Sequence, residues 1–228
     1  METIAIFHSP FPEKFGIPRQ SSLVAELPGE VHLTGVYRNP DALRGLEEFE
    51  YIWLIWGFSA NPPTAEGTWK ATVRPPRLGG NRRLGVFATR SPFRPNPLGL
   101  SSVRLERVDF EKGILYVRGA DLMDGTPVYD IKPYLPYTDA HPEAAGGFTD
   151  RTEWQSLEVV LPEKFVALFP LEELSSLKAA LALDPRPHYQ DDPQKEYGLT
   201  FAGRTVRFVV SGTVLTVTDV TRDGTDPE

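Results

Sequence analysis

The sequence of 228 residues contains no cysteine and no long hydrophobic run. Without cysteine there can be no disulfide framework, no thiolate chemistry, no cysteine-ligated zinc site and no iron–sulfur cluster. No segment approaches the length of a membrane-spanning helix, and the apolar run near the N-terminus is too short for a signal peptide. We therefore expect a cytoplasmic protein.

Several catalytic motifs are also missing. The sequence has no Walker loop, no GxGxxG run, no HExxH pair among its four histidines, and no GxSxG elbow around Ser101. These absences argue against a Rossmann site, a zinc protease and a serine hydrolase. The sequence offers neither a resident metal site nor a covalent nucleophile.

Acidic residues are absent from one basic stretch, residues 67–105. The net charge of −7 for the whole chain would by itself argue against a nucleic-acid partner. A basic stripe on an acidic body nevertheless suits local recognition of phosphates, and the alternative is a solvated face. Eight like charges repel one another unless a partner neutralises them, which favours a partner. They belong to Lys70, Arg74, Arg77, Arg82, Arg83, Arg90, Arg94 and Arg104.

A proline-rich loop, GVFATRSPFRPNPLGLS, occupies residues 85–101 within this stretch. Its glycine and first apolar residues predict a strand that breaks on three prolines, and a second strand begins at Ser101. The loop carries Arg90, Arg94 and Asn96 on a stiff backbone, so that little entropy is lost when a ligand binds. It favours an anionic or multi-hydroxyl ligand. The alternative is a plain strand connection whose prolines prevent edge pairing.

Strand patterns dominate the first 120 residues. Roughly six or seven strand segments and one short helix, which begins near Pro40, precede residue 120. Residues 51–58, YIWLIWGF, are almost wholly apolar, which predicts a strand buried on both faces. This pattern indicates a mainly β fold, an antiparallel barrel or sandwich, rather than a doubly wound α/β sheet.

A polar, glycine-rich segment near residues 141–151 predicts a linker. After it, residues 162–169 and 171–183 are expected to form helices, the second with a leucine stripe typical of core packing. A closing hairpin ends the chain. We predict a β-barrel domain at residues 1–140 and a small α+β domain at residues 152–228.

Carboxylates gather in residues 120–139, ADLMDGTPVYDIKPYLPYTD. Asp121 and Asp124 lie three positions apart around a turn and can together engage ribose hydroxyls or an amine, because carboxylates only accept hydrogen bonds. The alternative is that Asp124 and Gly125 merely form a turn and that Asp130 pairs with an arginine. We expect the arginines of the proline-rich loop to face this segment across neighbouring strands.

Two long motifs, RLGGNRRLGVFATRSPFRPNPLGLS and DLMDGTPVYDIKPYLPY, resemble the signatures of the TsaA/TrmO family of S-adenosylmethionine-dependent tRNA methyltransferases. PFPEKFGIPRQ and DPRPHY also resemble this family, so the resemblance covers nearly the whole chain. It implies a β-barrel fold, a homodimer, and N6-methylation of the threonylcarbamoyl-adenosine beside the anticodon of threonine tRNA. It implies neither a metal nor a membrane partner.

The resemblance also implies a site for S-adenosylmethionine in the N-terminal domain. Ser21-Ser22 stands where relatives often carry Pro-Gly, and Ser59-Ala60 where they carry His-Gln. These departures leave open a non-catalytic RNA-binding adaptor on the same barrel, or a methyltransferase of another substrate. The implied cofactor-binding residues are Gln20, Ser21, Ser22, Ser59, Ala60, Arg90, Leu100, Asp121, Leu122, Met123 and Asp124.

Methylation of this N6 nitrogen calls for a base, because a nitrogen flanked by a carbonyl is a poor nucleophile until its proton is removed. The candidate catalytic residues are Asp124, Asp130 and Tyr134, which sequence alone does not separate. We expect the C-terminal domain to contact tRNA as well. The residues expected to bind tRNA phosphates are Arg77, Arg82, Arg83 and Arg94.

Overall fold

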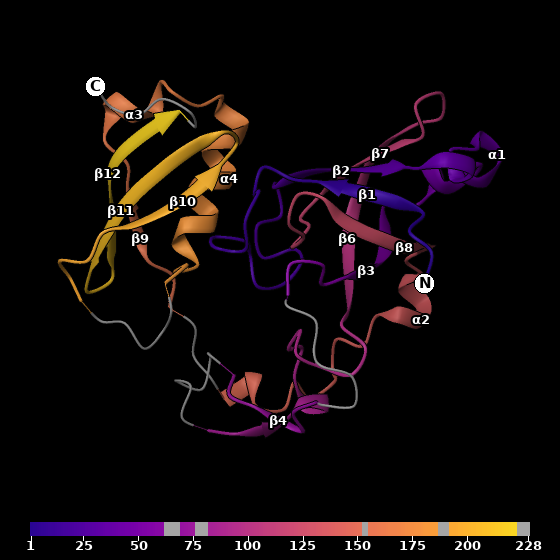
Figure 1. Cartoon of the computed structure of the whole chain (residues 1–228), viewed down its shortest axis with the longest axis horizontal. Helices are drawn as coiled ribbons and strands as arrows, with labels where there is room; N and C mark the ends of the chain where they lie inside the picture. Colours follow the sequence, from indigo (N-terminus) through magenta and orange to yellow (C-terminus); the bar gives the residue numbers. More distant parts are fainter. Residues whose placement is uncertain (62–68, 76–81, 152–154, 187–191, 223–228) are drawn as a thin grey trace.

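A closed barrel and a separate four-stranded sheet make up the protein, as seen in a computed structural model (Figure 1). The structure describes residues 1–61, 69–75, 82–151, 155–186 and 192–222. The mainly β, antiparallel-barrel prediction is confirmed. None of the helices in the described ranges is long and apolar enough to span a membrane.

Six antiparallel strands close the barrel in the order β1-β2-β7-β6-β3-β8. Alternate side chains of each strand point inward and form one buried apolar cluster, while the others face outward. Strands β1 and β8 complete the circle through the pairing of Ala5 with Val128, which leaves no free sheet edge. The strands are β1 (Ala5–His8), β2 (Pro28–Leu33), β3 (Tyr51–Gly57), β6 (Leu98–Asp109), β7 (Ile114–Arg118) and β8 (Thr126–Pro133).

The aromatic strand β3 is buried on one face only, so the expectation of burial on both faces was wrong. Ile52 and Leu54 point into the barrel and are fully buried. On the outer face Trp53 is half-buried, and its indole N–H donates to Asp139 Oδ2 at 2.8 Å. Polar and aromatic neighbours around helix α2 (Pro136–Asp139) therefore shelter the outer side chains in place of a second apolar layer.

Short elements connect the barrel strands. Helix α1 (Pro40–Leu43) begins after Asn39, whose side chain accepts a hydrogen bond from the Asp41 N–H at 3.0 Å. A small two-stranded ladder of β4 (Thr72–Val73) and β5 (Leu84–Gly85) lies below the barrel in Figure 1. The 3₁₀ helices are η1 (Gly35–Tyr37), η2 (Leu46–Glu48), η4 (Val86–Ala88) and η5 (Thr149–Arg151).

The C-terminal sheet has the strand order β10-β11-β12-β9, with β9 parallel to β12. The predicted helices and closing hairpin are present, whereas strand β10 was not expected. Leu174, Leu177 and Leu181 of α4 are buried, but Leu171 is exposed and lies outside the stripe. The elements are β9 (Glu158–Val160), α3 (Glu163–Val166), α4 (Leu171–Ala182), β10 (Tyr197–Phe201), β11 (Arg204–Ser211) and β12 (Val214–Arg222).

The long loop between β1 and β2, residues 9–27, contributes to the C-terminal core rather than to the barrel core. Phe11, Val24 and Leu27 belong to the same buried cluster as the leucines of α4. The Ala202 N–H also donates to the Pro10 carbonyl at 2.8 Å. A loop of the N-terminal region therefore holds the two units together, and the predicted division of the chain near residues 141–151 stays a prediction.

Candidate active site

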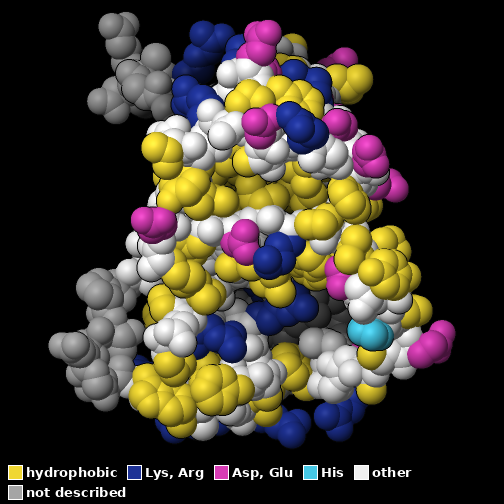
Figure 2. Space-filling model, turned by 90° about the vertical axis from the view of Figure 1, so that its right-hand side faces the viewer, with side chains coloured by type: hydrophobic (Ala, Val, Ile, Leu, Met, Phe, Trp, Pro, Cys, Tyr) yellow, Lys and Arg dark blue, Asp and Glu magenta, His cyan; other side chains and the backbone are white. Residues whose placement is uncertain are grey.

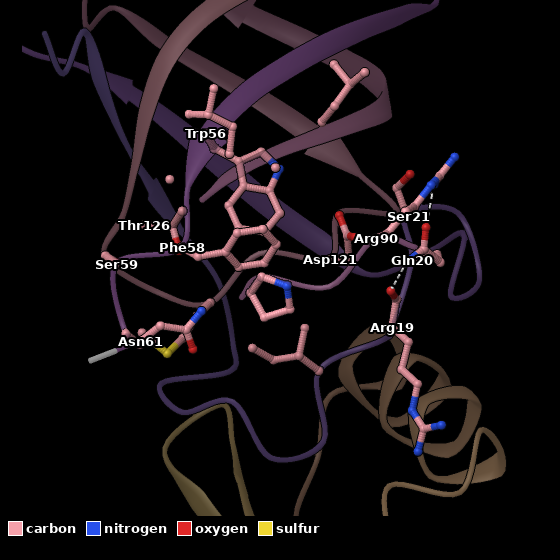
Figure 3. A pocket seen from close by; sticks show the side chains of 18 of the residues that line it. Arg19, Gln20, Ser21, Trp56, Phe58, Ser59, Asn61, Arg90, Asp121 and Thr126 are labelled. Carbon is pink, nitrogen blue, oxygen red and sulfur yellow. Dashed lines mark hydrogen bonds between the residues drawn. The ribbon is translucent and has the colours of Figure 1, made fainter. Parts of the chain in front are cut away.

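A cavity of about 730 Å³ opens at one end of the barrel (Figure 3). Its walls come from the β1–β2 loop, the end of β3, the proline-rich loop, the start of β6 and the segment before β8. The volume lies within the range of sites for cofactors and small ligands. The proline-rich loop runs directly into β6, but the other segments are far apart in the sequence, and barrel closure brings them all to one place.

The floor of the cavity is aromatic. The rings of Trp56 and Phe58 have centroids 4.4 Å apart and are tilted by 59°. Trp56 lies so close to β6 that a Cβ built at Gly99 would come within 2.1 Å of its Cε2 atom. Glycine at this position therefore makes room for the indole. Flat apolar rings offer a surface on which a purine base can stack.

A chain of hydrogen bonds runs from this floor to Asp121. The Trp56 Nε1–H donates to Ser101 Oγ at 2.9 Å, and Ser101 Oγ lies 2.5 Å from Asp121 Oδ1. Because an indole N–H can only donate, the serine oxygen accepts from it and the serine hydroxyl donates to the carboxylate. Because Ser101 is buried and shielded from water, its hydroxyl holds the Asp121 carboxylate in one orientation.

Burial raises the pKa of the Asp121 carboxyl above its usual range. The Ser101 hydroxyl, the backbone N–H groups of Asp121 and Ser21, and the positive charge of Arg90 oppose this rise without cancelling it. The result is a carboxylate that lines a cavity and holds a proton more readily than an ordinary aspartate. Groups with this combination of burial and charge partner are candidates for functional sites.

Arg90 and Gln20, seventy positions apart, meet at the rim of the cavity (Figure 3). The Arg90 guanidinium donates to Gln20 Oε1, and the Gln20 amide in turn donates to the Arg19 carbonyl. The Arg19 side chain donates to the carbonyls of Asp184 and Arg186, at 3.3 and 3.4 Å. The position of the rim is therefore linked to the end of helix α4.

Asn61 supplies a polar group that lacks a partner. Its Oδ1 accepts a hydrogen bond from Lys14 Nζ at 2.5 Å. Its Nδ2 is the one buried side-chain polar atom without a hydrogen-bond partner in the part of the chain that the structure describes. A buried donor left unsatisfied in a cavity wall is suited to a ligand acceptor.

Most of the residues predicted to bind the cofactor line this cavity, and three do not. Leu122 points into the barrel core and is almost fully buried. Ser22 has a φ of +65°, where glycine is favoured, and its N–H donates to the Gly119 carbonyl at 2.7 Å. Asp124 is the third residue outside the lining. Those in the lining are Gln20, Ser21, Ser59, Ala60, Arg90, Leu100, Asp121 and Met123.

The three candidate catalytic residues do not come together in the cavity wall. Asp124 Oδ1 lies 3.1 Å from both His8 Nδ1 and the Ser9 N–H nitrogen. Asp130 forms an ion pair with the lysine two positions later and borders a second hollow of about 390 Å³. Tyr134 packs against the Trp53 ring on the outer face of β3. Their proposed roles stay predictions.

Of the predicted RNA contacts, only Arg94 is part of the cavity lining among the described residues. Arg94 donates to the Thr89 carbonyl at 3.2 Å. Arg82 and Arg83 are exposed immediately before β5. Arg77 lies outside the described residues. Within the described ranges, no group of three or more His, Asp or Glu side chains is arranged to hold a metal ion.

The site residues that were not expected from the sequence include Trp56, Phe58, Asn61 and Ser101. The first two belong to an aromatic run that resembles core. A usable signal lay in β6, whose inward positions begin with Gly99 and Ser101 before the large apolar residues appear. Small residues at one end of an inward-facing row leave space inside a barrel, which here admits the Trp56 indole that forms the floor of the cavity.

Two family models match the chain. The tRNA-methyltransferase O N-terminal domain matches residues 6–140, and the TrmO C-terminal domain matches residues 167–223. Among curated relatives, the tRNA (adenine(37)-N6)-methyltransferase of Escherichia coli (strain K12) is 44% identical over 209 residues, covering 88% of this chain and 87% of the relative.

Further relatives agree with this match. A putative S-adenosylmethionine-dependent methyltransferase, RcsF, of Pseudomonas aeruginosa is 43% identical over 205 residues, covering 86% of each chain. Among solved structures, TrmO from the same organism superimposes with a TM-score of 0.77 at 33% identity, covering 96% of this chain and 95% of that one.

Proposed function

This chain belongs to the tRNA-methyltransferase O family, and we propose that it transfers a methyl group from S-adenosylmethionine to N6 of an adenine in tRNA. One observation carries the proposal: every residue that lines the cavity lies within residues 6–140, the range matched by the N-terminal family model. The aromatic floor, the oriented carboxylate and the rim arginine are therefore parts of one site.

The chemical groups around the cavity fit the cofactor. The rings of Trp56 and Phe58 suit its adenine, and the Asp121 carboxylate suits its ribose hydroxyls or its amino group. The guanidinium of Arg90 suits its carboxylate, and the Asn61 amide adds a donor. When bound, S-adenosylmethionine supplies the electrophilic methyl group.

The protein's own groups then align the acceptor base and manage its proton. We propose Asp121 as the carboxylate that accepts the N6 proton or holds the cofactor, because it lines the cavity and its pKa is raised. Asp124, Asp130 and Tyr134 are the remaining candidates. Alignment in a partly enclosed site supplies much of the rate enhancement in transfers of this kind.

The finer substrate and partner assignments are proposals as well. We propose that the acceptor is the threonylcarbamoyl-adenosine beside the anticodon in threonine tRNA, that the enzyme works as a homodimer, and that it acts in the cytoplasm. Mass spectrometry of tRNA nucleosides from a strain lacking this protein is expected to show loss of the N6-methyl group on that base. Unchanged modification would contradict the substrate assignment.

A non-catalytic RNA-binding adaptor is the second candidate function. It is favoured by Ser59 and Ala60, exposed residues of the cavity wall at positions where relatives often carry His-Gln. Calorimetric titration with S-adenosylmethionine separates the two functions, because the adaptor is expected to bind no cofactor. The enzyme is expected to bind it with a stoichiometry of about one per site.

Replacing Arg82 by Ala is expected to weaken tRNA binding and lower the salt dependence of the affinity by about one unit of slope. The reason is that each phosphate contact releases bound counterions when it forms. The measurement is tRNA affinity over a series of salt concentrations. Arg44→Ala is the matched control, because Arg44 is an exposed arginine directly after α1, and α1 lies away from β4 in Figure 1. An unchanged slope in the Arg82 variant would remove this residue from the interface.

Replacing Asp124 by Asn is expected to lower the single-turnover rate at least about tenfold without lowering the melting temperature. The amide oxygen of Asn can still accept from the Ser9 N–H, and Asn suits turns, so the fold is preserved. The charge next to His8 is lost. A rate within about twofold of wild type would assign Asp124 to the turn alone.

A further inference from the structure

Two large aromatic side chains that flank the β4–β5 ladder in the sequence stand exposed. Trp69 is 49% exposed and Phe87 is 72% exposed. Their ring centroids lie 5.8 Å apart with a tilt of 32°. A contiguous exposed aromatic surface on a folded protein commonly marks a site of interaction. Neither residue lines the cavity described above.

The backbone holds this pair in place. Trp69 lies shortly before β4 and Phe87 shortly after β5, and the ladder pairs Thr72 with Gly85. The Val86 N–H donates to the Ala71 carbonyl at 2.9 Å and extends the ladder toward the rings. Val86 is buried while its neighbour Phe87 faces solvent, so the turn of η4 directs the ring outward. The surface is formed before any partner arrives.

Positive charge surrounds the pair. Lys70, Arg74, Arg82 and Arg83 are all exposed, and no Asp or Glu occurs anywhere in residues 67–105. Among the described residues these four cations form no ion pair. In the lower part of Figure 2, hydrophobic and Lys or Arg side chains lie next to one another on this end of the molecule. Aromatic faces among basic side chains are the combination that binds unpaired nucleic-acid bases together with their phosphates.

The pair also lies close to the reaction site along the chain. Only three positions separate Phe87 from Arg90, which stands at the cavity rim. Three residues span at most about 11 Å even when fully extended. A strand of RNA with one base in the cavity can therefore place a nearby base on Trp69 and Phe87.

We propose that Trp69 and Phe87 form a stacking site for an unpaired base of single-stranded RNA that neighbours the target adenine. The inference rests on the proposed function and adds the means by which an RNA loop is gripped. A second copy of this chain is the less favoured occupant, because a two-fold contact would place the same unpaired arginines opposite one another.

The test compares Trp69→Ala, Phe87→Ala and the double variant with Tyr137→Ala, in which an exposed aromatic of α2 is removed. The probe is a synthetic hairpin RNA carrying the anticodon loop of threonine tRNA, and a fully paired RNA duplex serves as the comparison ligand. Trp69→Ala and Phe87→Ala are each expected to bind the hairpin about 5- to 150-fold more weakly than wild type, which is the range for loss of one stacked base. The salt dependence should stay that of wild type, because no charge is removed. Duplex binding and the Tyr137 variant should be unaffected.

Three results would overturn the inference: wild-type hairpin affinity in the double variant, equal losses for hairpin and duplex, or conversion of the protein to a smaller oligomer in light scattering. Conversion to a smaller oligomer would show that Trp69 and Phe87 belong to an interface between copies of the chain. The proposed function is tested separately, by measuring whether wild-type protein transfers the methyl group of S-adenosylmethionine to tRNA purified from a strain lacking the protein. Transfer by wild type with unchanged binding by the double variant would reject the stacking site alone.

Discussion

Replacing Asp121 by Asn is expected to lower the single-turnover rate of methyl transfer by about 100-fold or more, the lower end of the loss when a general base is removed. Asn keeps nearly the same shape and can still accept from the Ser101 hydroxyl, so the site geometry is preserved. It has no negative charge to hold the cofactor or to take a proton. The measurement uses saturating tRNA and cofactor.

The same replacement is expected to lower the rate without lowering the stability of the fold. Burial raises the pKa of Asp121, so the folded chain binds this proton more tightly than the unfolded chain does. The stabilising contribution of this group is complete below the unfolded pKa and is lost as pH rises through the folded pKa. As pH rises through the folded pKa, the buried carboxylate becomes destabilising, and the neutral amide removes that cost.

We accordingly expect the melting temperature of the Asp121→Asn protein at neutral pH to equal or exceed that of wild type. Ser101→Ala is the companion variant, because it removes the hydroxyl that orients the carboxylate while leaving the charge. It should reduce the rate less than the loss of the charge does. A fully active Asp121→Asn protein would contradict the proposed role of Asp121 and leave Asp124, Asp130 and Tyr134 as the candidates for the catalytic base.

Replacing Phe11 by Ala is expected to lower the free energy of unfolding by about 3–5 kcal/mol. Phe11 is completely buried, and its ring meets that of Phe201 edge-on with centroids 5.0 Å apart. Removal of the ring leaves a cavity where the β1–β2 loop enters the C-terminal core. Urea unfolding measures the loss, and we also expect weaker binding of S-adenosylmethionine, because the same loop carries Gln20 and Ser21.

Phe7→Ala is the matched control for this loss of cofactor binding. Phe7 is equally buried and only four positions away, but it belongs to the barrel cluster. Its truncation should cost a comparable free energy of unfolding. If the two variants lose cofactor affinity to the same extent under conditions where both are folded, the loop has no special link to the C-terminal core.

The strands of the barrel were largely predictable because alternation of apolar and polar residues reports burial on one face. The exception was β3, in which outward aromatic residues such as Trp53 carry hydrogen-bonding groups satisfied by distant polar partners. Strand β8 was hidden because its residues, including Asp130 and Lys132, were read as a functional segment. Alternation says which face is buried only when the outer face is polar.

The site was predictable where chemistry showed in the sequence, as at Arg90 and Asp121, which the structure brings to one cavity. It was not predictable where function depends on spatial pairing. Nothing local to Ser101 indicates that it links an indole 45 positions earlier to a carboxylate 20 positions later. Likewise, exposure of Trp69 and Phe87 depends on how a short ladder aims them. Sequence patterns report burial more readily than they report mutual distance.

The packing of Phe11, Val24 and Leu27 among C-terminal residues bears on how such proteins can be recombined. A chimera that exchanges only residues 155–222 for those of a relative would set a foreign core against three native side chains. Close packing penalises such a mismatch even when every residue involved is apolar. Exchange of residues 9–27 together with the C-terminal sheet should keep the core intact. The natural unit of exchange is thus discontinuous, with its smaller part inside the half of the chain that carries the candidate site.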